Sequence, residues 1–388
     1  MKNFVLVIFS FLTATLTSCS SDGQEHVTPT PQPEIPNDKD SAEHPPVVRG
    51  FMVQSADGLA KSTLESARAW GANVIRLQLN PTYYALQNKK DIWEALPTYL
   101  DIVQEKILMA KSVGLMVIVD LHEPPMLIDG AQPDPGTNRF WNTAGLKENF
   151  IRIWQAIATK FSNSSFDDVI WGYDLYNEPQ INWSTMPQQW LNMAPEIVGA
   201  IREIDKNKWI VFQPVVNIEE FNNLTPLADK KIVYSIHFYS PYRFTHQGLD
   251  QYYATGMTHS EAVSIFSGEY PGVYNSTYVS YTTLEKELRP LIAFASKNKV
   301  PVLIGEFSVI SWAPTESAKR WLTDVIDLFE KNNFSWCYHA FREWQGWSLE
   351  QPEGPENFWF SYETTPAPAT GETQRAKIIK DALKKNSQ

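Results

Sequence analysis

Short apolar runs alternate with stretches of helical periodicity from residue 48 onward, and this alternation constrains the fold more than any other feature. In the intervening stretches apolar residues recur at helical spacing, as at Phe150, Ile153 and Ile157. The apolar runs predict strands at 48–53, 73–79, 115–121, 168–176, 208–216, 232–239, 301–307 and 334–341. Helices are predicted at 60–71, 93–113, around 150–161, at 187–206, 284–298, around 321–329 and at 374–385, with only a short helix at 219–229.

Eight strand-then-helix units in succession predict the α/β class and a single (β/α)8 barrel, the TIM barrel. Several of the runs are continuously apolar, as expected for parallel strands that are covered on both faces. A doubly wound open sheet is the alternative, but no Gly-rich phosphate turn follows the first strand. The barrel is expected to occupy residues 48–388.

The N-terminus has the pattern of a secretory signal over residues 1–18. Lys2 supplies the positive start, and the apolar run from Phe4 to Thr15 is too short to span a membrane comfortably. The run ends in Leu-Thr-Ser-Cys, which resembles a bacterial lipobox in which Cys19 is acylated; a plain secretory signal is the alternative. The lipobox predicts a protein of the bacterial cell envelope, on the outer membrane, cell surface or periplasmic face, held to the membrane only by its lipid.

Residues 19–47 are rich in Pro, Ser, Thr, Asp and Glu and lack apolar periodicity, which predicts a disordered tether. The chain has 2 cysteines, so acylation of Cys19 would leave Cys337 unpaired and exclude an intrachain disulfide or a cysteine zinc cluster. A net charge of −11 argues against nucleic acid or anionic lipid as the main partner. We expect a monomer without a cofactor or a metal.

Polar and titratable residues are concentrated at the ends of the predicted strands. In a TIM barrel the chemistry lies at the C-terminal strand ends and in the loops that follow them. These positions hold Arg76, His122, Glu123, Asn177, Glu178, His237, Tyr239, Glu306, His339, Arg342, Glu343 and Trp344. Packing alone does not explain so many polar residues at strand ends.

Glu178 and Glu306 each close an apolar strand, and their strands lie three apart around the barrel. The two carboxyl groups are therefore expected on opposite walls of the barrel mouth. Glycoside hydrolysis uses such a pair, one carboxyl donating a proton to the leaving oxygen and the other attacking the anomeric carbon or activating water. Buried structural carboxylates are the alternative for either residue.

Four motifs together resemble glycoside hydrolase family 5, the cellulase family. They are VIRL at 74–77, YNEP at 176–179, HFY at 237–239 and IGEF at 304–307, and the resemblance covers residues 48–383. It implies retaining chemistry with Glu178 as general acid/base and Glu306 as nucleophile. It also implies that Arg76 and Tyr239 hold Glu306 ionised and oriented, where a structural ion pair and simple packing are the alternatives.

The same resemblance implies further roles around the sugar. His237 would lie near Glu178, Asn177 would bind the sugar 2-hydroxyl, and His122 would bind another hydroxyl; core histidines are the alternative for the two histidines. The family usually carries a Trp near the end of strand eight, where this sequence has His339 in SWCYHAFREW. We expect Trp344 to replace it, with Trp336 as the alternative.

Two other features are assigned to the cleft. Trp141 in NRFWN resembles a cleft residue of the family, and the Tyr-rich segment 242–283 is either a cleft wall or a self-packed subdomain.

The function predicted is a retaining β-glycanase acting on polysaccharide or oligosaccharide, with endo-β-1,4-glucanase first and β-mannanase or exo-β-1,3-glucanase next.

Two other classes of function stay open. A non-catalytic sugar-binding barrel is disfavoured by the complete set of supporting side chains. A metal-dependent hydrolase using His122, Glu123 and His237 is disfavoured because the first strand lacks a His-x-His pair.

Overall fold

The computed structural model describes residues 44–125, 134–182, 184–249, 261, 268–358 and 367–387. Eight parallel strands close into a barrel in the order β1-β10-β9-β6-β5-β4-β3-β2. The strands are β1 Arg49–Val53, β2 Val74–Leu79, β3 Met116–Leu121, β4 Ile170–Asp174, β5 Trp209–Phe212, β6 Ile232–His237, β9 Val302–Glu306 and β10 Ser335–Phe341. The predicted barrel is confirmed, and the open doubly wound sheet is wrong.

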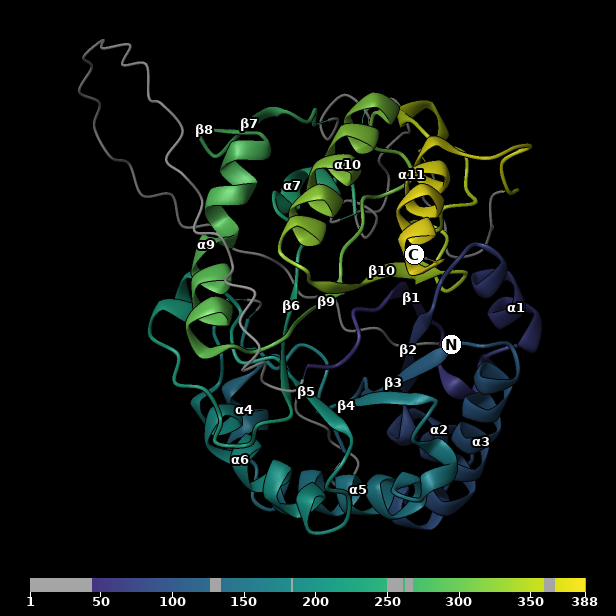
Figure 1. Ribbon diagram of the computed structural model, residues 1–388, viewed down its shortest axis with the longest axis vertical. Coiled ribbons are helices and arrows are strands. Elements are labelled where there is room, and N and C mark those ends of the chain that lie inside the picture. Colours follow the sequence, from purple (N-terminus) through teal and green to yellow (C-terminus); the bar gives the residue numbers. More distant parts are fainter. Residues whose placement is uncertain are drawn as a thin grey trace.

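Helices surround the strands on the outside (Figure 1). The long ones are α1 Lys61–Ala69, α3 Ile92–Ser112, α5 Leu146–Phe161, α6 Gln188–Arg202, α9 Tyr281–Asn298, α10 Thr315–Lys331 and α11 Gln374–Leu383. Three short helices were not predicted: α2 Pro81–Gln87, α4 Asn138–Trp141 and α7 Tyr242–Thr245. The short helix predicted at 219–229 is reduced to the 3-10 turn η3 Ile218–Asn222.

Apolar side chains form two layers. The larger layer lies between the strands and the helices and includes the fully buried Trp154, Trp190 and Trp321. The smaller layer lies inside the barrel and consists of Val48, Val74, Ile118, Trp171, Trp209, Val211, Val233, Leu303 and the free Cys337. Arg76, Asp120 and Ser235 follow members of the inner layer by two positions, so they face the barrel interior as well. These polar side chains therefore lie next to the layer of apolar side chains inside the barrel.

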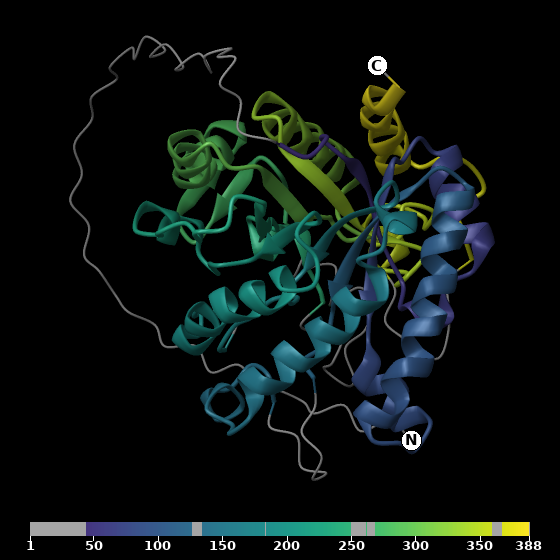
Figure 2. The same ribbon diagram turned by 60° about the horizontal axis from the view of Figure 1, so that its bottom comes forward.

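The first and last described segments meet at one side of the barrel. Asn386 Nδ2 donates hydrogen bonds to the carbonyl oxygens of Arg49 and Gly71, at 3.0 and 2.9 Å. Figures 1 and 2 show α11 beside α1 from two directions. The C-terminal helix thus covers the strands at which the barrel closes.

Part of the Tyr-rich segment packs on the barrel rather than forming a wall. Tyr270 is buried and donates to Asp324 of α10 at 2.7 Å, and Tyr281 donates to Asp327 of the same helix at 2.8 Å. A hairpin, β7 Gly272–Tyr274 and β8 Thr277–Val279, connects these two tyrosines. Tyr252 and Tyr253 lie outside the described residues.

The predicted signal peptide, Cys19 and most of the tether also lie outside the described residues, so lipidation stays a prediction. No helix in the part of the chain that the structure describes is long and apolar enough to cross a membrane.

The close contact between β1 and β2 generates a stability prediction. A Cβ added to Gly50 would stand 1.8 Å from the carbonyl oxygen of Val74, so Gly50→Ala forces the paired strands apart. We expect the free energy of unfolding to fall by at least about 2 kcal/mol, measured by urea denaturation.

Gly199→Ala is the matched control, because Gly199 is exposed in α6 and an added Cβ meets nothing within 4 Å. It is expected to raise the free energy of unfolding by about 0.5–1 kcal/mol. Equal effects of the two substitutions would contradict the close packing at Gly50.

Candidate active site

Two glutamates approach each other at the C-terminal ends of β4 and β9. Glu306 is the last residue of β9 and is only 4% exposed, whereas the Glu178 side chain is 28% exposed. His237 Nδ1 lies 2.7 Å from Glu178 Oε1. A carboxylate oxygen of each glutamate and a ring nitrogen of His237 all lie within 4.8 Å of one another. One carboxylate is thus enclosed, and the other is partly open to solvent.

Glu178 is held by an unusual backbone conformation. Its φ of 48° lies in the left-handed region, which costs a non-glycine residue about 1–2 kcal/mol. Neighbouring hydrogen bonds fix the turn: the Asn177 N–H donates to the Leu121 carbonyl at 3.0 Å, and the Glu178 N–H donates to Gln213 Oε1 at 3.3 Å. The chain therefore leaves the sheet at the residue whose side chain reaches His237.

Arg76 is the fully buried centre of the site. Its guanidinium donates to Glu306 Oε1 at 2.8 Å, to Asp174 Oδ2 at 2.8 Å, to Asp120 Oδ1 at 2.9 Å and to Asn177 Oδ1 at 3.0 Å. Burial opposes its charge, but the three carboxylates outweigh burial and raise the pKa of Arg76. Arg76 is therefore a permanent cation that ties together β2, β3, β4 and β9.

Glu306 has several partners besides Arg76. The Tyr239 hydroxyl donates to Glu306 Oε2 at 2.8 Å, and the same oxygen lies 3.0 Å from His339 Nδ1 and 3.5 Å from His237 Nδ1. Burial disfavours the ionised carboxyl, yet His237, His339 and Arg76 together hold the pKa of Glu306 well below its usual value. Glu306 is therefore an ionised carboxylate at neutral pH.

His122 and Asn177 join this network through their neighbours. His122 Nδ1 lies 2.8 Å from Asp120 Oδ2; burial opposes protonation, but Asp120 prevails and raises the pKa of His122. Asn177 is oriented by the hydrogen bond that its Oδ1 accepts from Arg76. Both side chains lie beside the carboxylate pair at intermediate exposure.

The sequence interpretation gave no role to Asp120, Asp174 or Glu343. Burial raises the pKa of Asp174 to about 6 even though Arg76 opposes this shift. Asp120 and Asp174 precede the strand-end residues His122 and Glu178 by two and four positions. A carboxylate inside an otherwise apolar strand was the signal that could have revealed Asp120 and Asp174; Glu343 follows β10 and gave no such signal.

Of the two tryptophans considered as replacements for the missing strand-eight Trp, the structure excludes Trp336, and Trp344 stays a prediction. Trp336 is fully buried and donates from its indole to Glu330 on α10, so the alternative that it supports the sugar is wrong. Trp344 packs edge-on against Trp347, with ring centroids 5.4 Å apart. The ring centroid of Trp347 lies 6.0 Å from the ring centroid of Tyr239 and 6.0 Å from that of His339.

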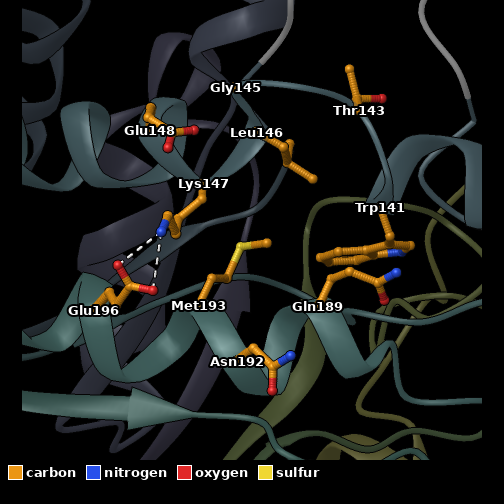
Figure 3. A pocket seen from close by; sticks show the side chains of 10 residues that line it. All are labelled: Trp141, Thr143, Gly145, Leu146, Lys147, Glu148, Gln189, Asn192, Met193 and Glu196. Atoms are coloured by element: carbon orange, nitrogen blue, oxygen red, sulfur yellow. Dashed lines mark hydrogen bonds and ion pairs between the residues drawn. The ribbon is translucent and has the colours of Figure 1, made fainter.

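Trp141 is only 2% exposed, which leaves little of its ring for stacking on a sugar. Its indole donates to the carbonyl oxygens of Pro135 and Gln180 at 2.9 and 3.2 Å, and so anchors the chain just after Glu178. Its ring borders a hollow of about 300 Å³ next to α5 and α6. Figure 3 shows that hollow with its Lys147–Glu196 ion pair.

The metal-binding alternative is not supported by the geometry. Glu123 Oε1 accepts a hydrogen bond from the Tyr83 N–H, and His122 is bound to Asp120. Among the described residues, the one cluster close enough to share an ion is Glu178, His237 and Glu306. The predicted set of His122, Glu123 and His237 is therefore not brought together there.

The chain is similar to known proteins of one family. A family model described as Cellulase (glycosyl hydrolase family 5) matches residues 40–344. Endoglucanase C of Acetivibrio thermocellus is 26% identical over 291 residues, which cover 70% of this chain and 81% of the relative. Cellodextrinase A of Ruminococcus flavefaciens is 23% identical over 278 residues, covering 71% and 76%.

Solved structures show the same fold. Cel5A of Thermotoga maritima in complex with cellobiose superimposes with a TM-score of 0.61 at 21% identity, covering 87% of this chain and 97% of that one. The family model spans well over half of the sequence and includes all four strand-end motifs. The chain therefore belongs to the cellulase family, glycosyl hydrolase family 5, as those motifs predicted.

Proposed function

We propose that this protein is a retaining β-glycoside hydrolase with Glu306 as nucleophile and Glu178 as general acid/base. The observation that carries the proposal is the pair of carboxyl groups in contrasting environments, with oxygens within 4.8 Å. Retaining enzymes hold the two carboxyls about 5–5.5 Å apart, and inverting enzymes about 6.5–9.5 Å apart. The short separation supports retention.

The chemistry proceeds in two displacements. Glu306 attacks the anomeric carbon while Glu178 gives its proton to the departing glycosidic oxygen, which leaves a glycosyl ester on Glu306. Glu178 then takes a proton from water, the water oxygen bonds to the anomeric carbon, and the Glu306 carboxylate departs. Arg76 and Tyr239 stabilise the charge that returns to Glu306, each at a different carboxylate oxygen.

The remaining side chains position the sugar and the acid/base. Asn177 is assigned to the 2-hydroxyl and His122 to another hydroxyl of the same sugar unit. His237 orients Glu178 through its 2.7 Å contact. A non-catalytic sugar-binding barrel would not require a nucleophile-like carboxylate with this many hydrogen-bond donors.

The favoured substrate is a β-1,4-glucan that is cut internally. Two relatives of the chain are named endoglucanase and cellodextrinase. The Thermotoga maritima Cel5A structure is also known with mannotriose, which keeps β-mannan as the second candidate. Exo-β-1,3-glucan hydrolysis is the third.

A polysaccharide panel tests the substrate. We expect carboxymethylcellulose or mixed-linkage β-glucan to be cut with a rapid loss of viscosity, because internal cleavage shortens chains early. Exclusive hydrolysis of β-mannan, or release of glucose from chain ends alone, would contradict this assignment.

Glu306→Gln tests the nucleophile. The change removes the attacking carboxylate while keeping its size, so kcat is expected to fall by at least about 10³-fold. Glu330→Gln is the matched control: this carboxylate is also largely buried and paired with Arg49, but it lies on α10 outside the site. Comparable kcat losses in both variants would argue against a special role for Glu306.

Glu178→Ala tests the acid/base. Loss of proton donation is expected to slow polysaccharide cleavage by about 10²–10⁴-fold, with a much smaller effect on the first step for an aryl glycoside with a good leaving group. Azide is expected to restore part of the turnover of the aryl substrate and to give a glycosyl azide of retained configuration. Polysaccharide cleavage near the wild-type rate would show that the assignment is wrong.

A further inference from the structure

His339, at the end of β10, lies between two carboxylates. Its Nδ1 is 3.0 Å from Glu306 Oε2 and 2.7 Å from the Tyr239 hydroxyl, and its Nε2 is 3.0 Å from Glu343 Oε2. A neutral imidazole has one N–H and would present a lone pair to one of the carboxylates. Contact with a carboxylate at each ring nitrogen therefore favours the doubly protonated imidazolium.

Glu343 is itself fixed in place. Gln78, which follows Arg76 by two positions on β2, donates from Nε2 to Glu343 Oε1 at 3.0 Å. Burial opposes the charge on His339, but Glu306 and Glu343 outweigh it and raise the pKa of His339 to about 10. The same imidazolium overcomes burial of Glu343 and lowers the pKa of that carboxyl.

The charges around Arg76 favour a further cation beside Glu306. The Arg76 guanidinium is shared among Asp120, Asp174 and Glu306, so one positive charge faces three carboxylates. Arg76 contacts Oε1 of Glu306, while His339 contacts Oε2. Each oxygen of the carboxylate thus has its own cationic neighbour.

We propose that His339 and Glu343 are positioning residues of the hydrolase. His339 is a second cation that keeps Glu306 ionised and oriented, and Glu343 keeps His339 in its charged form. This inference rests on the proposed function, because it assigns the pair to the nucleophile. It also gives strand eight an electrostatic role at the position where the family usually carries a Trp.

Other ionisable groups surround the His339–Glu343 pair and contribute to the pH dependence of activity. They lie on β2, β3, β4, β6, α7 and β9 or directly after these elements, and they are Arg76, Asp120, His122, Asp174, Glu178, His237, Tyr239, His246 and Glu306. Burial lowers the pKa of His246 to about 3, so its ring is neutral over the working range. His246 is therefore a suitable control.

The test compares the pH dependence of kcat/KM in three variants. His339→Gln removes the cation but keeps a polar side chain. Because that cation lowers the pKa of Glu306, its loss is expected to move the acidic limb to higher pH by about one unit or more. Glu343→Gln removes an anion while Glu306 still holds His339 protonated at acid pH, so the acidic limb stays in place or moves to lower pH.

His246→Gln changes a neutral ring that packs edge-on against Tyr239 without adding or removing charge, so no shift of the acidic limb is expected. If His339→Gln folds and its acidic limb coincides with that of the wild type, the proposal is overturned. An upward shift in Glu343→Gln would overturn it as well. In His339→Gln, a purely structural role would lower activity without moving the acidic limb.

A measurement on the wild-type protein keeps the inference testable if His339→Gln does not fold. NMR of ¹³Cε1-labelled histidine follows the 7 ring signals directly. In the wild type we expect one ring to remain imidazolium at pH 8.5. In Glu343→Gln the same ring is expected to lose its proton at a lower pH than in the wild type. If every ring of the wild type is neutral at pH 8.5, the proposal is overturned. An active Glu306→Gln would instead overturn the proposed function, so the two failures are distinct.

Discussion

The contact on which the site depends is the buried guanidinium of Arg76. It joins carboxylates from three other strands at 2.8–2.9 Å, so the C-terminal ends of β2, β3, β4 and β9 are held in register by one cation. Removing either side of a buried ion pair leaves an uncompensated charge, which costs about 3–5 kcal/mol. The same contacts that connect these strand ends also orient Glu306. Stability and chemistry are therefore linked at this residue.

The two glutamates beside Arg76 lie in contrasting surroundings. Glu306 is enclosed and surrounded by donors, which suits a carboxylate that must be ionised before attack and leave easily afterwards. Glu178 is more exposed and touches His237, which suits a group that exchanges protons with water. The His339–Glu343 pair extends the enclosure of Glu306 through strand eight. The left-handed backbone at Glu178 holds the second carboxyl close to the first.

Much of the fold could be predicted from the sequence, because buried parallel strands and amphipathic helices have distinct periodicities. Short elements were not predicted: α2 spans seven residues beginning at Pro81, too few to show a helical pattern. Strand-end residues such as Arg76 and Glu306 could be identified because topology brings such ends together. The roles inferred for Asp120 and His339 could not, since they depend on side chains from other strands, such as Gln78 beside Glu343.

The most direct test of the account is to trap the glycosyl-enzyme. A 2-deoxy-2-fluoro-β-cellobioside with a dinitrophenolate leaving group slows the second displacement, so the ester accumulates on the nucleophile. Intact-mass spectrometry is expected to show one added fluorocellobiosyl group per chain, and peptide mapping is expected to place it on Glu306. Attachment to Glu178, or efficient turnover of cellulosic substrate with inversion and no trapped ester, would contradict the central claim.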